Sequence, residues 1–197
     1  MKRLLAALAL AAFITALVAI ALGSASSGGD DKEASSTTVR TLPRTTARPT
    51  TTAPAPRARA IRLGAVGAYD PEGDDHENDD LAPQAVDGDS STFWRTEHYT
   101  HGFFKKGVGL LLDAGAGRTI TKVTVSTDGA GSSAQIRLGR TTTGPFRAVT
   151  PVKPLEGTTN FPLEKGSAGR YVVVWITGVP PALGEAHVTE VRAFGTT

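Results

Sequence analysis

The stretch Leu81-Ala-Pro-Gln-Ala-Val-Asp-Gly-Asp-Ser-Ser-Thr-Phe-Trp94, followed by Arg95-Thr96, combines acids, a glycine, hydroxyls and one of the two tryptophans of the chain. Asp87-Gly88-Asp89 has the composition of a tight turn, because glycine adopts positive φ and aspartate closes local side-chain-to-backbone hydrogen bonds. Trp94 offers a large apolar ring that is most stable inside a core. The pattern therefore predicts a turn that leads into a core strand.

The oxygen atoms of this turn suggest a metal. Asp87, Asp89 and Thr92 carry the hard oxygen ligands that calcium prefers. Two interpretations follow from these residues: a structural calcium loop at the edge of a β-sandwich, or a plain Asp-Gly turn that ends in a core strand. The residues alone leave both open.

Around this turn the chain reads as short strands separated by turn residues. Residues 134–138 alternate cleanly, which directs Ala134, Ile136 and Leu138 inward. Residues 170–177 are apolar on both faces and predict a central strand. Further strands are expected at 61–66, 107–113, 119–126, 146–149, 158–161 and 185–194. Since no segment after Ile61 has a 3.6-residue apolar stripe, we expect an all-β antiparallel sandwich or barrel over residues 61–197.

The N-terminus differs sharply from the rest of the 197-residue chain. Lys2 and Arg3 precede 19 uncharged residues, Leu4 to Leu22, close to the roughly 20 that span a bilayer as a helix. The run fits a single-pass signal anchor over residues 1–23, and a cleaved signal peptide is the alternative. In either case we expect the remainder to be extracytoplasmic, membrane-bound if the segment stays and secreted if it is cleaved.

Residues 24–60 are rich in Ser, Thr, Pro and Arg and lack aromatics, so they predict a disordered linker. The linker and N-terminal segment hold eight Lys/Arg against three Asp/Glu, whereas residues 61–197 hold 13 against 16. The linker arginines suit either a solvated stalk or contact with anionic lipid or wall polymer. Because the folded part is mildly acidic, nothing supports nucleic-acid binding. The absence of cysteine excludes a lipoprotein and any disulfide framework.

Residues 70–80 carry seven acids and no base, and predict a loop. Like charges at this density repel one another unless a cation or a basic partner lies among them. A second calcium site and a solvated acidic loop are both compatible with the residues, although the spacing is not that of an EF-hand.

Ala85-Val86-Asp87-Gly88-Asp89 with Thr92 and Trp94 resembles the A-x-DG-x-x-x-T-x-W core of factor 5/8 type C, or discoidin, domains. The order Trp94-Arg95-Thr96, Trp175-Ile-Thr-Gly and Glu190-Val191 is similar to an actinobacterial extracytoplasmic version attached to Ser/Thr kinases or to flippases for cell-wall lipid precursors. The resemblance covers nearly all of residues 61–197. It implies a galactose-binding-like jelly-roll β-sandwich.

The resemblance also implies site residues. A structural calcium ion would be held by side chains and a backbone carbonyl: Ala85, Asp87, Asp89, Thr92 and Glu190. Trp94 and Trp175 would be core residues rather than sugar platforms. The expected ligand loop offers rings and donors at Tyr99, His101, Phe103 and Lys105, with Phe104 beside them, although Phe103 or Phe104 could equally seal the sandwich.

We therefore expect a non-catalytic module that binds a carbohydrate or a cell-wall polymer. A protein-interaction domain of an envelope complex is the alternative. An enzyme is not expected, because the acids crowd into one loop or the metal site instead of facing each other across a cleft, and no G-x-S-x-G elbow is present.

Overall fold

The computed structural model describes residues 57–196. The predicted anchor and almost all of the predicted linker lie outside these residues. Within the described part of the chain, no helix is long and apolar enough to cross a membrane.

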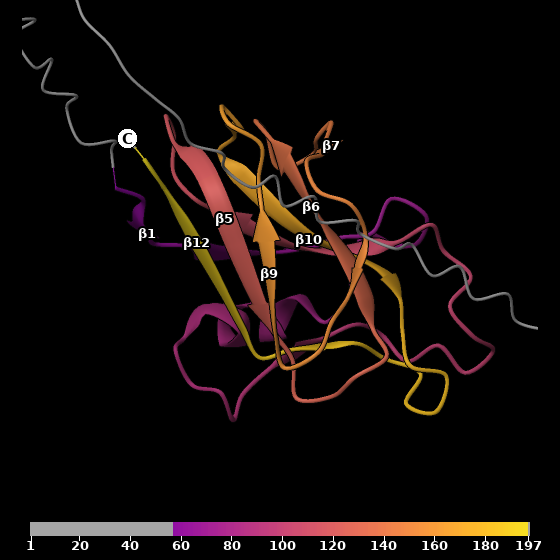
Figure 1. The fold of residues 1–197 in the computed structure, drawn as a ribbon. Coiled ribbons are helices and arrows are strands. Elements are labelled where there is room, and N and C mark those ends of the chain that lie inside the picture. The colour runs from indigo at the N-terminus through magenta and orange to yellow at the C-terminus, as the bar shows by residue number, and fades with distance from the viewer. Residues whose placement is uncertain (1–56, 197) are drawn as a thin grey trace, which may run out of the picture. The chain divides into compact units, whose positions relative to one another are not determined.

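Two antiparallel sheets face each other (Figure 1). The first has the strand order β1-β12-β5-β9 and the second β2-β4-β10-β6-β7, with β8 also paired to β6; a small third pair joins β11 to β3. The bounds are β1 Arg59–Ile61, β2 Gly64–Tyr69, β3 Trp94–Arg95, β4 Val108–Asp113, β5 Thr119–Ser126, β6 Ser133–Gly139, β7 Arg147–Ala148, β8 Lys153–Pro154, β9 Thr158–Pro162, β10 Tyr171–Gly178, β11 His187–Val188 and β12 Glu190–Thr196. The expected all-β sandwich is confirmed.

The central core forms where the inward sides of both sheets meet. Strand residues alternate between faces, so one side of β6 buries Ala134, Ile136 and Leu138 as predicted. Strand β10 lies between β4 and β6, which confirms the predicted central strand. Phe161 from β9 is fully buried in the same core.

Both faces of strand β10 are apolar, and each face packs against a different cluster of apolar side chains. Its alternate residues Tyr171, Val173 and Trp175 form a second cluster with Leu111, separate from the central core. The guanidinium carbon of Arg137 lies 4.0 Å from the centre of a Trp175 ring. Trp175 is therefore buried as predicted, but in this second cluster, whereas Trp94 is fully buried in the central core.

Two predictions about the elements were wrong. The expected first strand is broken into β1 and β2, and the last into β11 and β12, because each changes sheet. A 3-10 helix, η1 (Asp79–Val86), also occupies the start of the organising stretch, with Pro83 inside it. Its short, tightly wound backbone leaves no 3.6-residue stripe for the sequence to show.

Candidate functional site

Glu190 lies near the turn after η1, where β5 finishes and β12 begins, since the Gly88 amide and the charge of Asp87 both act on its carboxyl. Glu190, the first residue of β12, pairs in register with Ser126, the last of β5. The turn after η1 is closed by Asp87, whose Oδ1 accepts from the Asp89 amide at 2.8 Å and whose Oδ2 accepts from Thr92 Oγ1 at 2.8 Å. Thr92 Oγ1 also lies 3.0 Å from the Asp89 carbonyl oxygen.

Glu190 is the predicted metal ligand with the least satisfied carboxyl. Among residues 57–196, its buried Oε2 has no hydrogen-bond partner. Burial raises the pKa of this carboxyl, and the nearby charge of Asp87 raises it further, against the opposing effects of Arg192 and the Gly88 amide. A buried carboxylate oxygen without a partner is costly unless a donor or a cation meets it.

The donor set fits calcium only if backbone and hydroxyl oxygens contribute. Among residues 57–196, no group of three or more His, Cys, Asp or Glu side chains could hold a metal ion. The Asp89 side chain turns to Ser91, whose amide and hydroxyl donate to Asp89 Oδ1 at 2.9 and 2.7 Å. Asp87 and Glu190 would supply the charge, and Thr92 and carbonyls such as that of the buried Ala85 would complete the set.

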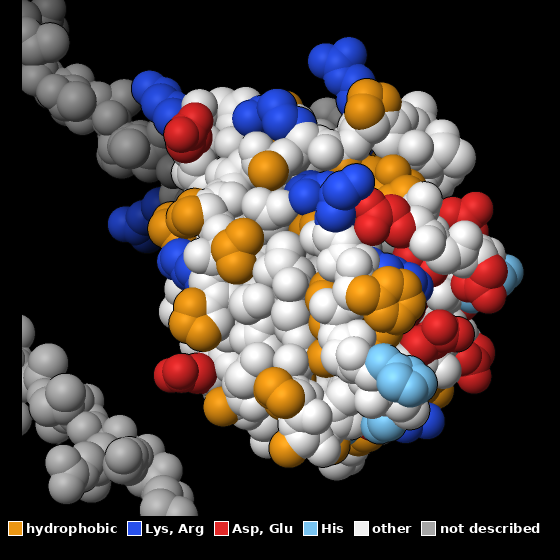
Figure 2. Space-filling model, turned by 90° about the vertical axis from the view of Figure 1, so that its right-hand side faces the viewer, with side chains coloured by type: hydrophobic (Ala, Val, Ile, Leu, Met, Phe, Trp, Pro, Cys, Tyr) orange, Lys and Arg blue, Asp and Glu red, His pale blue; other side chains and the backbone are white. Residues whose placement is uncertain are grey.

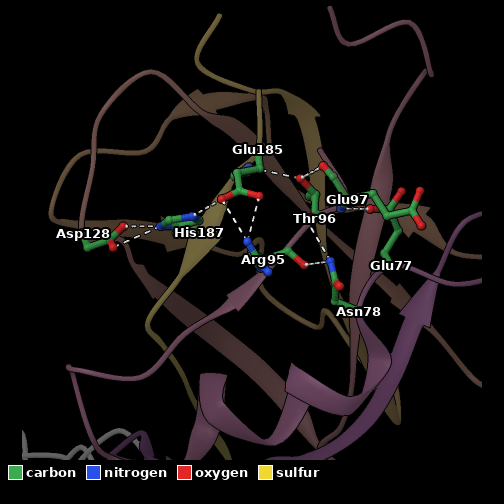
Figure 3. Close-up of polar contacts among 9 residues, drawn as sticks. Glu77, Asn78, Arg95, Thr96, Glu97, Asp128, Glu185 and His187 are labelled. Atoms are coloured by element: carbon green, nitrogen blue, oxygen red, sulfur yellow. Dashed lines mark hydrogen bonds and ion pairs between the residues drawn. The ribbon is translucent and has the colours of Figure 1, made fainter. Parts of the chain in front are cut away.

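A polar hollow of about 390 Å³ lies at this end of the sandwich, beside β3 (Figure 3). It is lined by Asn78, Arg95, Thr96, Glu97, His98 and Glu185. Strand alternation places Trp94 in the core and Arg95 outward. The hollow therefore follows directly from the stretch that organises the fold.

Hydrogen bonds from side chains and backbone hold the backbone that lines this hollow in place. Asn78 Nδ2 donates to the carbonyl oxygens of Arg95 and Thr96, at 3.3 and 3.0 Å. Thr96 exchanges bonds with Ala186: its amide donates to the Ala186 carbonyl, and its Oγ1 accepts from the Ala186 amide at 3.1 Å. Gly184, at φ +72°, leaves room for His98, since a Cβ there would lie 2.9 Å from His98 Nε2.

A chain of charged groups runs along one wall, as Figure 3 shows. Arg95 Nη1 donates to both oxygens of Glu185, at 3.4 and 3.3 Å. His187 bridges Glu185 and Asp128, with its Nε2 3.0 Å from Glu185 Oε1 and its Nδ1 3.1 Å from each Asp128 oxygen. Burial would raise the pKa of Glu185, but His187 and Arg95 outweigh it and the pKa is lowered.

The acidic loop rests on one buried lysine. Lys105 Nζ lies 2.7 Å from Asp70 Oδ2 and 2.9 Å from Glu77 Oε1, and all three side chains are almost fully buried. Burial lowers the pKa of Lys105, but the hydrogen bonds to the two carboxylates raise it more. The basic partner that the crowded acids require is therefore supplied by the chain itself.

This arrangement separates the four predicted ligand residues. Tyr99 is buried and its hydroxyl donates to Glu77, so Tyr99 and Lys105 lie beneath the loop. Phe103 packs partly buried against the central core, and His101 is exposed. As ligand contacts all four stay predictions, but His101 is the exposed one among them, and neighbouring Phe104 is 77% exposed.

Of the residues that line the hollow, the sequence predicts His98 as part of the expected ligand loop. Local pattern does not identify Arg95, Glu97 or Glu185 as site residues. The alternation of polar Glu185 and His187 around apolar Ala186 indicates a strand with one polar face. It does not indicate that this segment, which includes β11, pairs with β3.

Comparison with known proteins supports the fold. No family model matches the chain. The structure is similar to a mutant of chitosan-binding module 1 from a chitosanase/glucanase of Paenibacillus sp. IK-5, with a TM-score of 0.53 and 17% identity over 71% of this chain and 100% of that one. It is also similar to CBM32-3 from a family 31 glycoside hydrolase of Clostridium perfringens, with a TM-score of 0.51 and 17% identity over 71% and 95% of the two chains.

A third similar structure is truncated AlyQ with CBM32 and alginate lyase domains, with a TM-score of 0.51 and 19% identity over 72% of this chain. The match spans 35% of that longer chain. At these identities the likeness establishes the fold, a galactose-binding-like β-sandwich of the kind found in family 32 carbohydrate-binding modules. The actinobacterial subtype stays a prediction.

Proposed function

We propose that this protein is a non-catalytic carbohydrate-binding module, and that its ligand enters the polar hollow beside β3. The observation that carries the proposal is the hollow itself: a rigid set of exposed donors and acceptors, Arg95, Glu97 and His98, at the loop end of the sandwich. Sugars present many hydroxyls, and a concave site with fixed polar groups recognises them by orientation. The similar structures named as carbohydrate-binding modules add support.

Phe104, the aromatic side chain that is most exposed among residues 57–196, is the platform we propose for such a ligand. Its ring packs edge-on against Tyr99, with centroids 5.8 Å apart, and Tyr99 follows His98 of the hollow in sequence. A ring held by one edge keeps a face available for stacking on a sugar. Tyr99 and Lys105 would then support the platform rather than touch the ligand.

Catalysis is the property that most needs testing, because two carboxyl groups line the hollow. Burial, then the charge of Glu77, raises the pKa of Glu97, whereas the pKa of Glu185 is lowered. Opposite shifts are typical of an acid and base pair. Glu185, however, is occupied by Arg95 and His187. We therefore expect no release of reducing ends from any glycan; turnover that disappears in Glu97→Gln would contradict this expectation.

Calcium would act as a structural element. Bound between the Asp87 turn and Glu190, it would tie the final strand to the stretch that precedes β3. The N-terminal sequence further supports an extracytoplasmic, membrane-tethered module, facing cell-wall polymer or another envelope glycan.

Binding is tested by titrating soluble cell-wall glycans and plain monosaccharides into the wild-type protein by calorimetry. Arg95→Gln should weaken binding by about tenfold or more, as loss of one charge-assisted hydrogen bond implies. Arg147→Gln, an exposed arginine on β7, is the matched control and should bind as wild type. An envelope protein that binds with no effect of any glycan would instead favour an interaction domain.

A further inference from the structure

A second hollow, of about 400 Å³, lies among Arg118, Arg140 and Arg170. It forms where β5 and β10 begin and where β4 and β6 end. The polar hollow lies beyond the opposite ends of β5 and β10, so the eight-residue strands separate the two sites by roughly 25 Å. We call this second hollow the arginine basin.

The arginine basin is built from backbone that other elements hold in place. The Ile120 amide donates to Ser167, and the Arg170 amide donates to Gly139, at 2.8 and 3.0 Å. Gly169 permits the close approach, since a Cβ there would lie 3.0 Å from the Cβ of Leu138. The walls are therefore as rigid as the strands that carry them.

The charge of the basin is strongly positive. None of its lining residues is acidic. The one carboxylate hydrogen-bonded to a lining residue of the described chain is that of Asp113. It accepts hydrogen bonds from Nε and Nη2 of Arg170, the latter at 2.8 Å. This pairing orients Arg170 and neutralises one of three charges, so the basin keeps a net charge of +2.

Several donors in the basin have no acceptor. In the part of the chain that the structure describes, buried Arg118 Nε has no hydrogen-bond partner. Within the described residues, Arg140 forms no hydrogen bond or ion pair, and Arg170 leaves Nη1 unused. Because buried donors are normally paired, Arg118 Nε can donate to an acceptor that enters the basin.

Figure 2 shows the same division of charge. Lys and Arg side chains lie mainly over the upper part of the face, the end at which β12 finishes, whereas Asp, Glu and His gather on its right-hand and lower sides. Arg59, paired with Gly195 at the end of β12, adds to the basic end.

We propose that the arginine basin binds a phosphate monoester. Guanidinium groups match the oxygens of a phosphate in pairs of parallel hydrogen bonds. A net charge of +2 suits the charge of about −1.5 to −2 that a phosphate monoester carries at neutral pH, better than the single charge of a carboxylate. The ligand can be a soluble phosphate or a phosphate-bearing lipid headgroup.

The test is calorimetric titration of inorganic phosphate into the full chain in an uncharged detergent, with sodium chloride at equal ionic strength as the reference. Phosphate should bind saturably and acetate should bind at least tenfold more weakly. Arg140→Gln should weaken phosphate binding by about tenfold. Because Arg140 is exposed and has no hydrogen bond or ion pair within residues 57–196, this variant should fold as wild type. Arg118→Gln should weaken binding as strongly, whereas Arg192→Gln, an exposed arginine on β12, should not.

A second titration, with detergent micelles containing phosphatidic acid or phosphatidylcholine, identifies the source of the phosphate. Tighter binding to phosphatidic acid than to inorganic phosphate assigns a lipid headgroup, and the reverse assigns a soluble ligand. Phosphate binding no stronger than that of chloride, or binding that survives both Arg140→Gln and Arg118→Gln, would overturn the proposal.

Discussion

Replacing Lys105 with methionine tests how the acidic loop is held. Methionine keeps most of the length of the side chain but removes the charge, which leaves Asp70 and Glu77 buried without their lysine partner. Both carboxylates are fully buried and the lysine side chain is 7% exposed. Breaking a buried ion pair by removing one partner costs about 3–5 kcal/mol. At roughly 4 °C per kcal/mol for a domain of this size, the melting temperature should fall by about 12–20 °C.

The neighbouring lysine is a matched control. Lys106 pairs with Glu72 at 3.0 Å, but its side chain is 89% exposed. Exposed ion pairs contribute little, so Lys106→Met should leave the melting temperature almost unchanged. Both variants are measured by calorimetry or circular dichroism at neutral pH and moderate salt.

Equal melting temperatures for Lys105→Met and Lys106→Met at neutral pH would refute the view that Lys105 compensates the acidic loop.

Three further outcomes follow from the site and the sheets. Because the folded-state pKa of Glu190 is raised, its ionisation opposes folding as the pH rises through that value; with EDTA at neutral pH, Glu190→Gln should therefore melt no lower than wild type. Calcium at one hundred times its Kd should stabilise wild type by about 2.7 kcal/mol but leave Glu190→Gln unchanged, and equal calcium shifts in the two proteins would remove Glu190 from the metal set. Gly107→Ala should destabilise strongly, since a Cβ there would lie 2.2 Å from the Trp175 ring at φ +156°; an unchanged denaturant midpoint would show that the Trp175 cluster can shift.

The local pattern of apolar and polar residues was sufficient to predict the strands that stay in one sheet along their whole length. Strand β5 has the bounds that its β-branched run predicted, and the alternation in β6 identified its buried face. Strands β1 and β2 belong to different sheets, as do β11 and β12, but the sequence predicts one strand in place of each pair. A continuous run of apolar residues does not indicate where the chain passes from one sheet to another.

The candidate site could be predicted only in part, because the sequence pattern does not show which distant segments lie side by side. Asp87 and Thr92 are close in sequence, so their contact could be expected from turn chemistry. Glu190 reached the predicted metal set only through the family resemblance. The polar hollow joins Arg95 to Glu185, 90 residues apart, and no local rule places them together. Lys105 looked like a ligand donor in sequence because its burial depends on Asp70 and Glu77 from a distant loop.

The central claim is that a carbohydrate binds in the polar hollow beside β3. The most direct measurement is amide chemical-shift mapping of the isotopically labelled protein during titration with soluble cell-wall glycan fragments. The account predicts saturable shifts concentrated on residues 95–98 and 184–187, and their loss in Arg95→Gln. Shifts confined to other surfaces, or no shifts with any glycan while the protein remains folded, would contradict it.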